Sequence, residues 1–178
     1  MCGFVGLAWG VGREAPDLHP VARGVASIAH RGPDSGGTIS VPFAHAEFRR
    51  LSVVDLEGGA QPMADERNEI QVFLNGEIYN HEELRRLLLR KGHVLSTKSD
   101  TEVLPHLWEE FGHAMLSMLN GMFAMCIVDS RTSDVYVVRD RLGVKPMFYA
   151  QTDHGVVFGS ELKALLATGL VDREVEPW

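Results

Sequence analysis

The opening stretch, residues 1–9, constrains the fold of this chain more than any other part of the sequence. Cys2 is followed by Gly3 to Trp9, an apolar run that is typical of a buried strand, and further glycines then mark a loop. Gly3 and Gly6 have no side chain, which lets a neighbouring part of the backbone approach the strand closely. We therefore expect a buried strand at the start of the chain, with Cys2 at its beginning.

Cys2 has a chemical option that Cys126 lacks. If Met1 is removed, Cys2 becomes the amino terminus and carries both a thiol and a free α-amine. An α-amine has a pKa of about 7.7–8.0, so part of it is neutral near pH 7 and can accept the thiol proton. With Met1 attached, the same nitrogen is an amide and cannot act as a base. Cys2 is thus either a nucleophile with its own base or an incidental small residue.

Length, charge and cysteine content narrow the class of protein. At 178 residues the chain is expected to form one domain over residues 1–178. The net charge is -7, from 17 basic and 24 acidic residues without a basic block, which argues against nucleic acid or an anionic membrane as a partner. No apolar run reaches the length of about 18 residues that a membrane helix needs. A catalytic thiol needs a reducing compartment, so a cytoplasmic location is expected.

The sequence lacks the usual motifs for metal and phosphate binding. Its eight histidines are scattered without a pair at metal-ligand spacing such as HExxH, and its two cysteines form no CxxC pair, so no metal site is expected. Residues Asp34 to Gly37 lack the lysine of a phosphate-binding loop, and we interpret them as a loop. Cys126 lies in an apolar run from Met122 to Val128 and is expected to fill the core.

Two strand-like runs contain residues with catalytic potential. Val41 to Asp55 contains Arg50, whose guanidinium is either a solvated charge or a two-pronged donor for a carboxylate. Ile70 to Leu74 leads directly into Asn75 and Gly76. Asn-Gly is a strong hairpin-turn signal, but an Asn amide and a Gly N–H held side by side also suit a developing oxyanion. These residues alone leave both pairs of alternatives open.

Capping signals surround a candidate acidic residue further along the chain. Asn80 and Glu83 are predicted to cap one helix, and Ser99 and Glu102 to cap the next. Asp100 can then stabilise the start of that second helix, bind an ammonium group, or serve both roles. The remaining expected elements are helices at 19–30, 81–91, 99–110, 113–118 and 160–167, and strands at 122–128, 135–139, 147–150 and 156–158.

Short motifs follow one another along nearly the whole chain in the order of a known family. They are MCGFVG at 1–6, RGPD at 31–34, RRLSVVD at 49–55, GAQPM at 59–63, NGEIYN at 75–80, SDTEV at 99–103, LNGMFA at 119–124, RDRLGVKPMFYA at 139–150 and GSELKAL at 159–165. With this set the sequence resembles the glutaminase domain of glutamine-hydrolysing asparagine synthetases, a class II glutamine amidotransferase. Other class II amidotransferases deliver ammonia to phosphoribosyl pyrophosphate or fructose 6-phosphate. Three of the motifs favour the asparagine synthetase branch over these: RRLSVVD, NGEIYN and RDRLGVKP. On its own, RGPD could be simply a turn.

The resemblance implies an α+β fold of the N-terminal nucleophile hydrolase type, with four αββα layers and two stacked, mainly antiparallel sheets. Cys2 would attack the side-chain amide of L-glutamine and release ammonia, and water would hydrolyse the γ-glutamyl thioester to glutamate. Asn75 and Gly76 would stabilise the oxyanion. The substrate would be held by Arg50 at its α-carboxylate, by Glu77 and Asp100 at its α-ammonium, and by a pocket wall from Leu51, Ser52, Val53 and Val54.

The resemblance also implies what the reaction needs and serves. No cofactor is expected for glutamine hydrolysis. The ammonia would pass to an ATP-dependent synthetase domain or subunit, where ATP and Mg are expected, and the SGGxDS loop of that domain does not occur up to Trp178. Aspartate is the first expected acceptor, giving asparagine, and a homodimer is a further partner that the resemblance allows. The alternatives are another acceptor, an amidase for another amide, and a non-catalytic glutamine-binding or regulatory domain.

Overall fold

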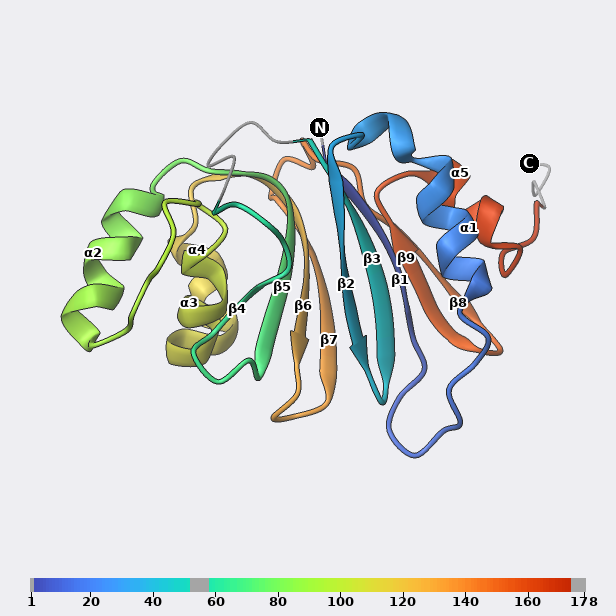
Figure 1. Cartoon of the computed structure of the whole chain (residues 1–178), viewed down its shortest axis with the longest axis horizontal. Helices are drawn as coiled ribbons and strands as arrows, with labels where there is room; N and C mark the ends of the chain where they lie inside the picture. Colours follow the sequence, from blue (N-terminus) through green and yellow to red (C-terminus); the bar gives the residue numbers. More distant parts are fainter. Residues whose placement is uncertain (1, 52–57, 174–178) are drawn as a thin grey trace.

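Two antiparallel β-sheets lie face to face, and helices cover the outer face of each (Figure 1). This computed structural model describes residues 2–51 and 58–173. The layers follow one another as helices, sheet, sheet and helices. This confirms the α+β class and the αββα arrangement that were predicted from the sequence.

The five-stranded sheet has the strand order β2-β3-β1-β9-β8. Its strands are β1 (Gly3–Ala8), β2 (Ser35–Val41), β3 (Ala44–Arg50), β8 (Phe148–Thr152) and β9 (Gly155–Gly159). β1 takes the centre, with Gly3 opposite Arg49 of β3 and Val5 opposite Gly159 of β9. The first strand of the chain is therefore paired on both sides, as its apolar sequence predicts, and Cys2 lies at its beginning.

The four-stranded sheet has the order β4-β5-β6-β7. Its strands are β4 (Met63–Ala64), β5 (Ile70–Ile78), β6 (Gly121–Asp129) and β7 (Asp134–Arg139). β5 is paired with β6 along its whole length, including Asn75 opposite Ala124 and Gly76 opposite Phe123. The hairpin turn that the Asn-Gly pair suggested is wrong, because the two residues lie inside a continuous strand.

The helices form two groups. α1 (His19–Ser27) and α5 (Leu162–Thr168) pack on the five-stranded sheet, and α2 (His81–Lys91), α3 (Val103–Phe111) and α4 (Met115–Met118) pack on the four-stranded sheet (Figure 1). Single 3₁₀ turns lie at η1 (Ala29–Arg31) and η2 (Gly112–Ala114). Pro20 lies in the first turn of α1, and α2 ends at Gly92, whose φ of 99° is left-handed. Within the described ranges, no helix is long and apolar enough to cross a bilayer.

Strand alternation divides the apolar side chains between three cores. In β5, Ile70 and Val72 face the helices, whereas Phe73 points between the sheets. Phe73 stacks on Phe48 of β3 with ring centroids 5.0 Å apart, so aromatic rings join the two sheets. Cys126 is fully buried in this middle core, and its burial raises the thiol pKa to about 12. Cys126 is thus core filling, as predicted.

The loop predicted at Asp34 to Gly37 is wrong, because its last three residues begin β2. Glycine is needed there for close packing and not for a turn. A Cβ atom on Gly37 would lie 1.8 Å from the carbonyl oxygen of Gln61, and one on Gly36 would lie 2.9 Å from that of Phe48. The strand expected over Val41 to Asp55 is also divided, since β2 ends at Val41 and β3 begins after a turn.

Both capping boxes predicted for the helices are wrong, because no side-chain capping hydrogen bond is made at the start of α2 or α3. Asn80 Nδ2 donates to the carbonyl oxygen of Met118 at 2.9 Å, and its Oδ1 accepts from the N–H of Asn120 at 2.9 Å. Glu102 accepts from the N–H of Ser96 at 2.6 Å. These polar side chains therefore connect separate segments instead of capping their own helices.

Candidate active site

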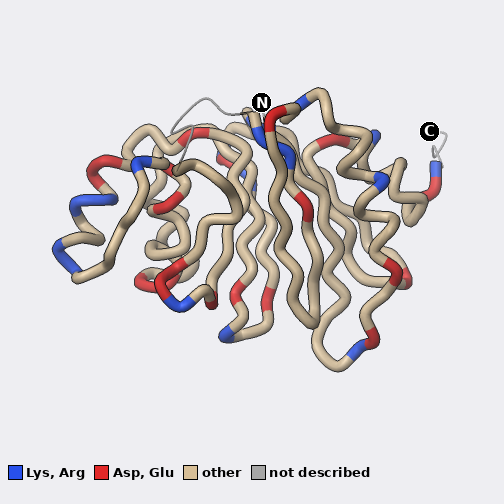
Figure 2. Tube along the Cα trace, viewed as in Figure 1, with Lys and Arg blue, Asp and Glu red and all other residues tan. Residues whose placement is uncertain are grey.

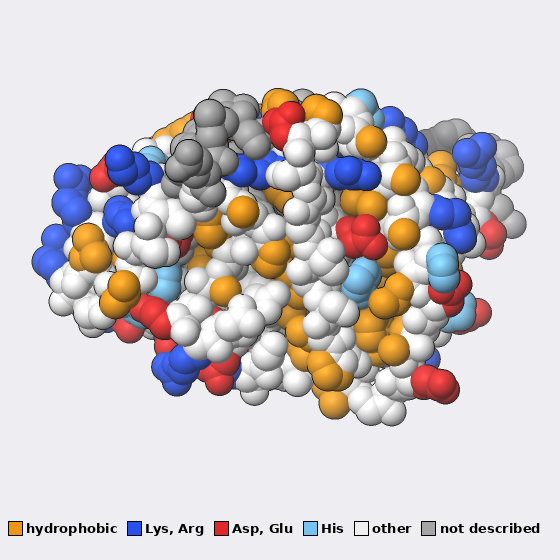
Figure 3. All heavy atoms as spheres, viewed as in Figure 1, with side chains coloured by type: hydrophobic (Ala, Val, Ile, Leu, Met, Phe, Trp, Pro, Cys, Tyr) orange, Lys and Arg blue, Asp and Glu red, His pale blue; other side chains and the backbone are white. Residues whose placement is uncertain are grey.

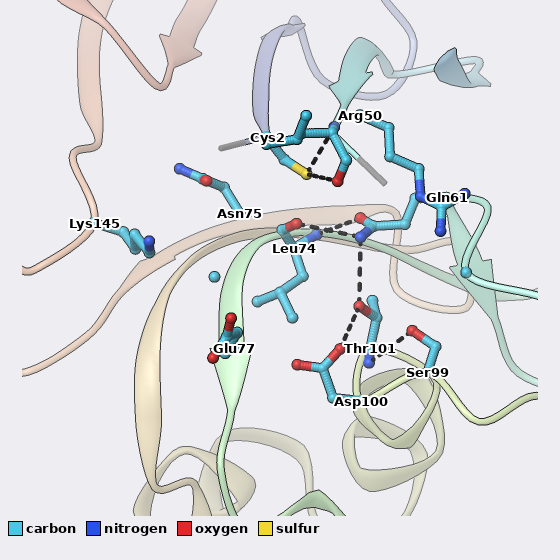
Figure 4. Close-up of a pocket in the computed structure, with 13 residues that line it drawn as sticks. Cys2, Arg50, Gln61, Leu74, Asn75, Glu77, Ser99, Asp100, Thr101 and Lys145 are labelled. Atoms are coloured by element: carbon cyan, nitrogen blue, oxygen red, sulfur yellow. Dashed lines mark hydrogen bonds between the residues drawn. The ribbon is translucent and has the colours of Figure 1, made fainter. Parts of the chain in front are cut away.

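A cavity of about 150 Å³ opens where the ends of β1, β3 and β5 meet (Figure 4). Loops before α3 and after β7 complete its wall. It is lined by every predicted site residue that the structure describes, namely Cys2, Arg50, Leu51, Asn75, Gly76, Glu77 and Asp100. The predictions for Ser52, Val53 and Val54 lie outside the described residues.

Cys2 presents its thiol to the cavity beside the end of β3. The side chain is half-buried, and Sγ accepts a hydrogen bond from the N–H of Leu51 at 3.4 Å. The thiol also approaches the carbonyl oxygen of Leu51 at 3.6 Å (Figure 4). The backbone of Leu51 therefore holds the sulfur at the edge of the cavity.

Asn75 and Gly76 lie in β5 and line the cavity together with Cys2. In the amide orientation that satisfies both neighbours, Asn75 Nδ2 donates to the carbonyl oxygen of Cys2 at 2.9 Å and Oδ1 accepts from Arg31 at 3.3 Å. A Cβ atom on Gly76 would lie 2.0 Å from the carbonyl oxygen of Met122. The strand therefore requires glycine here, next to an amide that is held in place.

Arg31 is a site residue that sequence reasoning missed. Its guanidinium is buried, and Nε donates to the carbonyl oxygen of Cys2 at 2.8 Å. Nη1 donates to Glu161 at 2.9 Å, across a separation of 130 residues in sequence. Burial opposes the charge on Glu161, but hydrogen bonds from Arg31 and two neighbouring side chains lower its pKa. RGPD is therefore more than a turn, since its first residue positions Cys2.

Arg50 is buried at the end of β3, and the interpretation of it as a solvated charge is wrong. Figure 2 shows basic residues gathered beside the N-terminus, at the end of the sheets where the cavity opens. Figure 4 shows Cys2 and Arg50 on one side of the cavity and Glu77 and Asp100 on the other. The cavity thus has a cationic side and an anionic side.

Asp100 and Glu77 form the anionic side. Asp100 is 9% exposed, and its Oδ2 accepts from the N–H of Ile78 at 2.9 Å. Its Oδ1 receives the hydroxyl of Thr101 at 3.4 Å. Since α3 begins only at Val103, Asp100 does not stabilise a first helical turn as one alternative suggested. Glu77 is exposed and completes the pair of carboxylates.

Gln61 and Lys145 also line the cavity, although no role was predicted for them. Gln61 accepts from the N–H of Leu74 at 2.7 Å and donates to its carbonyl oxygen at 3.2 Å, which fastens the loop before β4 onto β5. Lys145 is brought in by Asp140, which accepts from the N–H groups of Lys145 at 3.0 Å and Val144 at 2.9 Å. Burial opposes the charge on Asp140, but such backbone donors lower its pKa.

A comparison with protein families matches residues 1–177 to the family described as "Glutamine amidotransferase domain". The chain belongs to this family. The match confirms the resemblance that the motifs indicated, and the aligned stretch includes all the residues described above as lining the cavity.

Curated relatives of this glutamine amidotransferase domain are named as asparagine synthetases. The chain is 40% identical over 172 residues to "Asparagine synthetase [glutamine-hydrolyzing] 2" of Bacillus subtilis (strain 168), covering 94% of this chain and 22% of that protein. It is 42% identical over 139 residues to "Asparagine synthetase [glutamine-hydrolyzing] 2" of Oryza sativa subsp. japonica, covering 78% and 23%. The chain thus spans less than a quarter of these two relatives.

Solved structures of amidotransferases share the fold of this glutamine amidotransferase domain. One is the glutamine phosphoribosylpyrophosphate amidotransferase from B. subtilis complexed with ADP and GMP, with a TM-score of 0.78 and 26% identity over 99% of this chain and 46% of that one. A second, titled as the allosteric regulatory enzyme of purine biosynthesis, has a TM-score of 0.77 and 26% identity over 99% and 45%. This likeness confirms the predicted N-terminal nucleophile hydrolase fold.

Proposed function

We propose that the chain hydrolyses the side-chain amide of L-glutamine to glutamate and ammonia, with Cys2 as nucleophile. The observation that carries this proposal is the convergence of a thiol, a guanidinium and two carboxylates in one cavity. Arg50 is suited to hold an α-carboxylate through two parallel hydrogen bonds, and Glu77 and Asp100 are suited to hold an α-ammonium. This charge pattern is complementary to the head of a free amino acid.

The reaction begins with proton transfer from the Cys2 thiol to its own α-amine. The thiolate attacks the amide carbon, and the carbonyl electrons move onto the oxygen. Asn75 Nδ2 carries two hydrogens, of which the Cys2 carbonyl takes one, so the second can donate to this oxyanion together with the N–H of Gly76. When the oxyanion collapses, the carbon–nitrogen bond breaks and the ammonium form of the α-amine protonates the leaving ammonia.

Water then completes the cycle. The product of the first half is a γ-glutamyl thioester on Cys2. The neutral α-amine takes a proton from water as the water attacks the thioester carbon, and the same two donors stabilise the second oxyanion. The thiolate leaves and glutamate is released. No cofactor takes part in these steps.

The ammonia is proposed to serve an amidation elsewhere. Relatives whose names are those of asparagine synthetases support a link to an ATP-dependent synthetase domain or subunit, with aspartate as the first candidate acceptor. ATP and Mg would act only in that part. Supply of ammonia to a different acceptor stays an alternative. A second copy of this chain, forming a homodimer, is a further candidate partner.

The test measures glutamate and ammonia release from L-glutamine by the purified chain, with removal of Met1 checked by intact mass. Equal amounts of both products are expected, with Cys2→Ala inactive. Isothermal titration of glutamine into the Cys2→Ala protein measures binding without turnover. Assays with asparagine and simple acyl amides as substrates test whether the enzyme is specific for glutamine. Full activity in Cys2→Ala, or in protein that retains Met1, would contradict the mechanism. Glutamine binding without turnover in processed wild-type protein would indicate a regulatory domain instead.

A further inference from the structure

Two histidines and two glutamates meet on the helix-covered side of the four-stranded sheet. Glu66 lies in the turn between β4 and β5, His93 follows α2, and His106 and Glu109 lie one turn apart on α3. One ligand atom from each residue lies within 4.8 Å of the others. In Figure 3, histidine and acidic side chains lie together at the surface beside α2. We call these four residues the Glu66 cluster; none of them lines the cavity at Cys2.

The spacing of the Glu66 cluster suits a small cation. Glu66 Oε2 is 3.1 Å from His106 Nδ1, and Glu66 Oε1 is 3.3 Å from His93 Nδ1. His93 Nδ1 is also 3.9 Å from Glu109 Oε2. Ligand atoms at about 2.0–2.1 Å from a tetrahedral metal ion are about 3.3 Å apart. Because one ligand atom from each residue lies within 4.8 Å of the others, the side chains must move closer together to enclose one ion.

A buried nitrogen of His106 has an unused lone pair that suits a bound ligand. His106 is 2% exposed, and within the described part of the chain its Nδ1 has no hydrogen-bond partner of proper geometry, although Glu66 is close. Buried ring nitrogens are normally satisfied, so this atom needs an explanation. A metal ion bound to the Nδ1 lone pair supplies one.

The surroundings of the cluster resemble the outer shell of a metal site. His93 Nε2 lies 3.2 Å from Glu110 Oε1, and Lys91 holds the other oxygen of Glu110 at 2.6 Å. A carboxylate on the far nitrogen of a histidine fixes the tautomer that leaves the near nitrogen free for a metal. Arg67 donates to Glu109 Oε1 at 2.7 Å, so Oε2 is the oxygen that faces the cluster.

We propose that Glu66, His93, His106 and Glu109 bind one divalent transition-metal ion of the zinc class. Imidazole and carboxylate ligands suit Zn²⁺ and its neighbours, and four protein ligands leave no open position for chemistry. The ion is therefore structural. It would join the β4–β5 turn, the segment after α2 and the helix α3.

The test uses the chain with Cys2→Ala, because an N-terminal thiol and amine would themselves bind zinc. After chelator treatment and dialysis, isothermal titration with Zn²⁺ is expected to show one ion per chain, and Co²⁺ to give the visible bands of a tetrahedral site. Mutation of a residue that only supports a metal ligand typically weakens metal binding by about 10–100-fold. Glu66→Gln and His93→Gln each remove a ligand, so each should weaken Zn²⁺ binding by more than this. The exposed His154, in the turn between β8 and β9, provides the matched control His154→Gln, which should bind as before.

Thermal unfolding gives a second readout. Zn²⁺ should raise the melting temperature of the Cys2→Ala chain and of the His154→Gln control, but not that of Glu66→Gln. Glu66 is exposed, and a glutamine can still accept from the N–H of Val94, so this variant is expected to fold. Absence of stoichiometric Zn²⁺ binding, or equal binding in Glu66→Gln and in the control, would overturn the proposal.

Discussion

The guanidinium of Arg31 donates from Nε to the carbonyl oxygen of Cys2 at 2.8 Å. Asn75 reaches the same oxygen at 2.9 Å from the other sheet. Both donors act on the backbone of Cys2 and leave its thiol facing Leu51. Cys2 is therefore held through its carbonyl group, by the 3₁₀ turn η1 on one side and by strand β5 of the four-stranded sheet on the other.

Replacement of Arg31 should slow the chemical step. Arg31→Lys keeps the charge but loses the guanidinium, which donates to Cys2 and to Glu161 at the same time. A displacement of about 1 Å at the nucleophile can cost about 100-fold, so kcat should fall by about that factor with little change in KM for glutamine. Steady-state kinetics provide the measurement. Arg90→Lys, at an exposed position on α2, is the matched control and should keep wild-type kcat.

Asn75→Ala should lower kcat by about 10²–10³-fold, because one donor to the oxyanion is lost. Binding of glutamine to the ground state should change far less, so KM is expected to stay near the wild-type value. Circular dichroism should accompany the kinetics, since Asn75 is 1% exposed. Asn120→Ala, at an exposed position just before β6, is the control. Wild-type kcat in a folded Asn75→Ala protein would remove Asn75 from the proposed oxyanion site.

Arg50→Lys should weaken substrate binding more than turnover. The two parallel hydrogen bonds of a guanidinium to a carboxylate cannot be made by a lysine, and hydrogen bonds to charged groups contribute about 1.5–3 kcal/mol. KM for glutamine is expected to rise about 10–100-fold. The adjacent Arg49 does not line the cavity, so Arg49→Lys serves as the control. A glutamine analogue without the α-carboxylate should be turned over equally by both variants.

The charge on Glu102 should contribute to stability above the normal pKa of a glutamate. Burial opposes this charge, but N–H donors from Ser96 and Thr97 lower the pKa of Glu102, and Arg85 lies 3.2 Å away. A lowered pKa in the folded state means that the contribution is complete above about pH 4.3, the unfolded value, and is lost as the pH falls through the folded value. Glu102→Gln should lower the free energy of unfolding at pH 7 by about 1–3 kcal/mol.

Urea unfolding at several pH values checks this expectation. The difference between Glu102→Gln and the wild type should shrink as the pH falls below about 4, where the wild-type carboxylate becomes protonated. Glu82→Gln, at an exposed position on α2, should show no such difference at pH 7. A pH-independent difference for Glu102→Gln would show that the charge is not the cause.

The local sequence pattern predicts most helices and strands. It fails where a glycine can serve either a turn or close packing, and where a polar side chain can bond either to its own helix or to a distant segment. The apolar runs of β1, β5 and β6 were found because a strand buried on both faces is apolar throughout. Gly36 and Gly37 suggest a loop by composition, although they allow close packing within β2. Asn80 has the sequence signature of a helix cap, but it bonds to the segment before β6 because that segment lies within reach in the fold.

The sequence by itself determined the chemistry that the chain offers: a cysteine at position 2, Arg50, the Asn75–Gly76 pair and the acids Glu77 and Asp100. The resemblance of its motifs assigned these residues to one site. Only the tertiary structure decided that Arg31 holds Cys2 through contacts that reach Glu161, and that His93 and His106 meet. The physical reason is that periodicity reports which face of an element is buried, whereas such meetings depend on how whole layers stack.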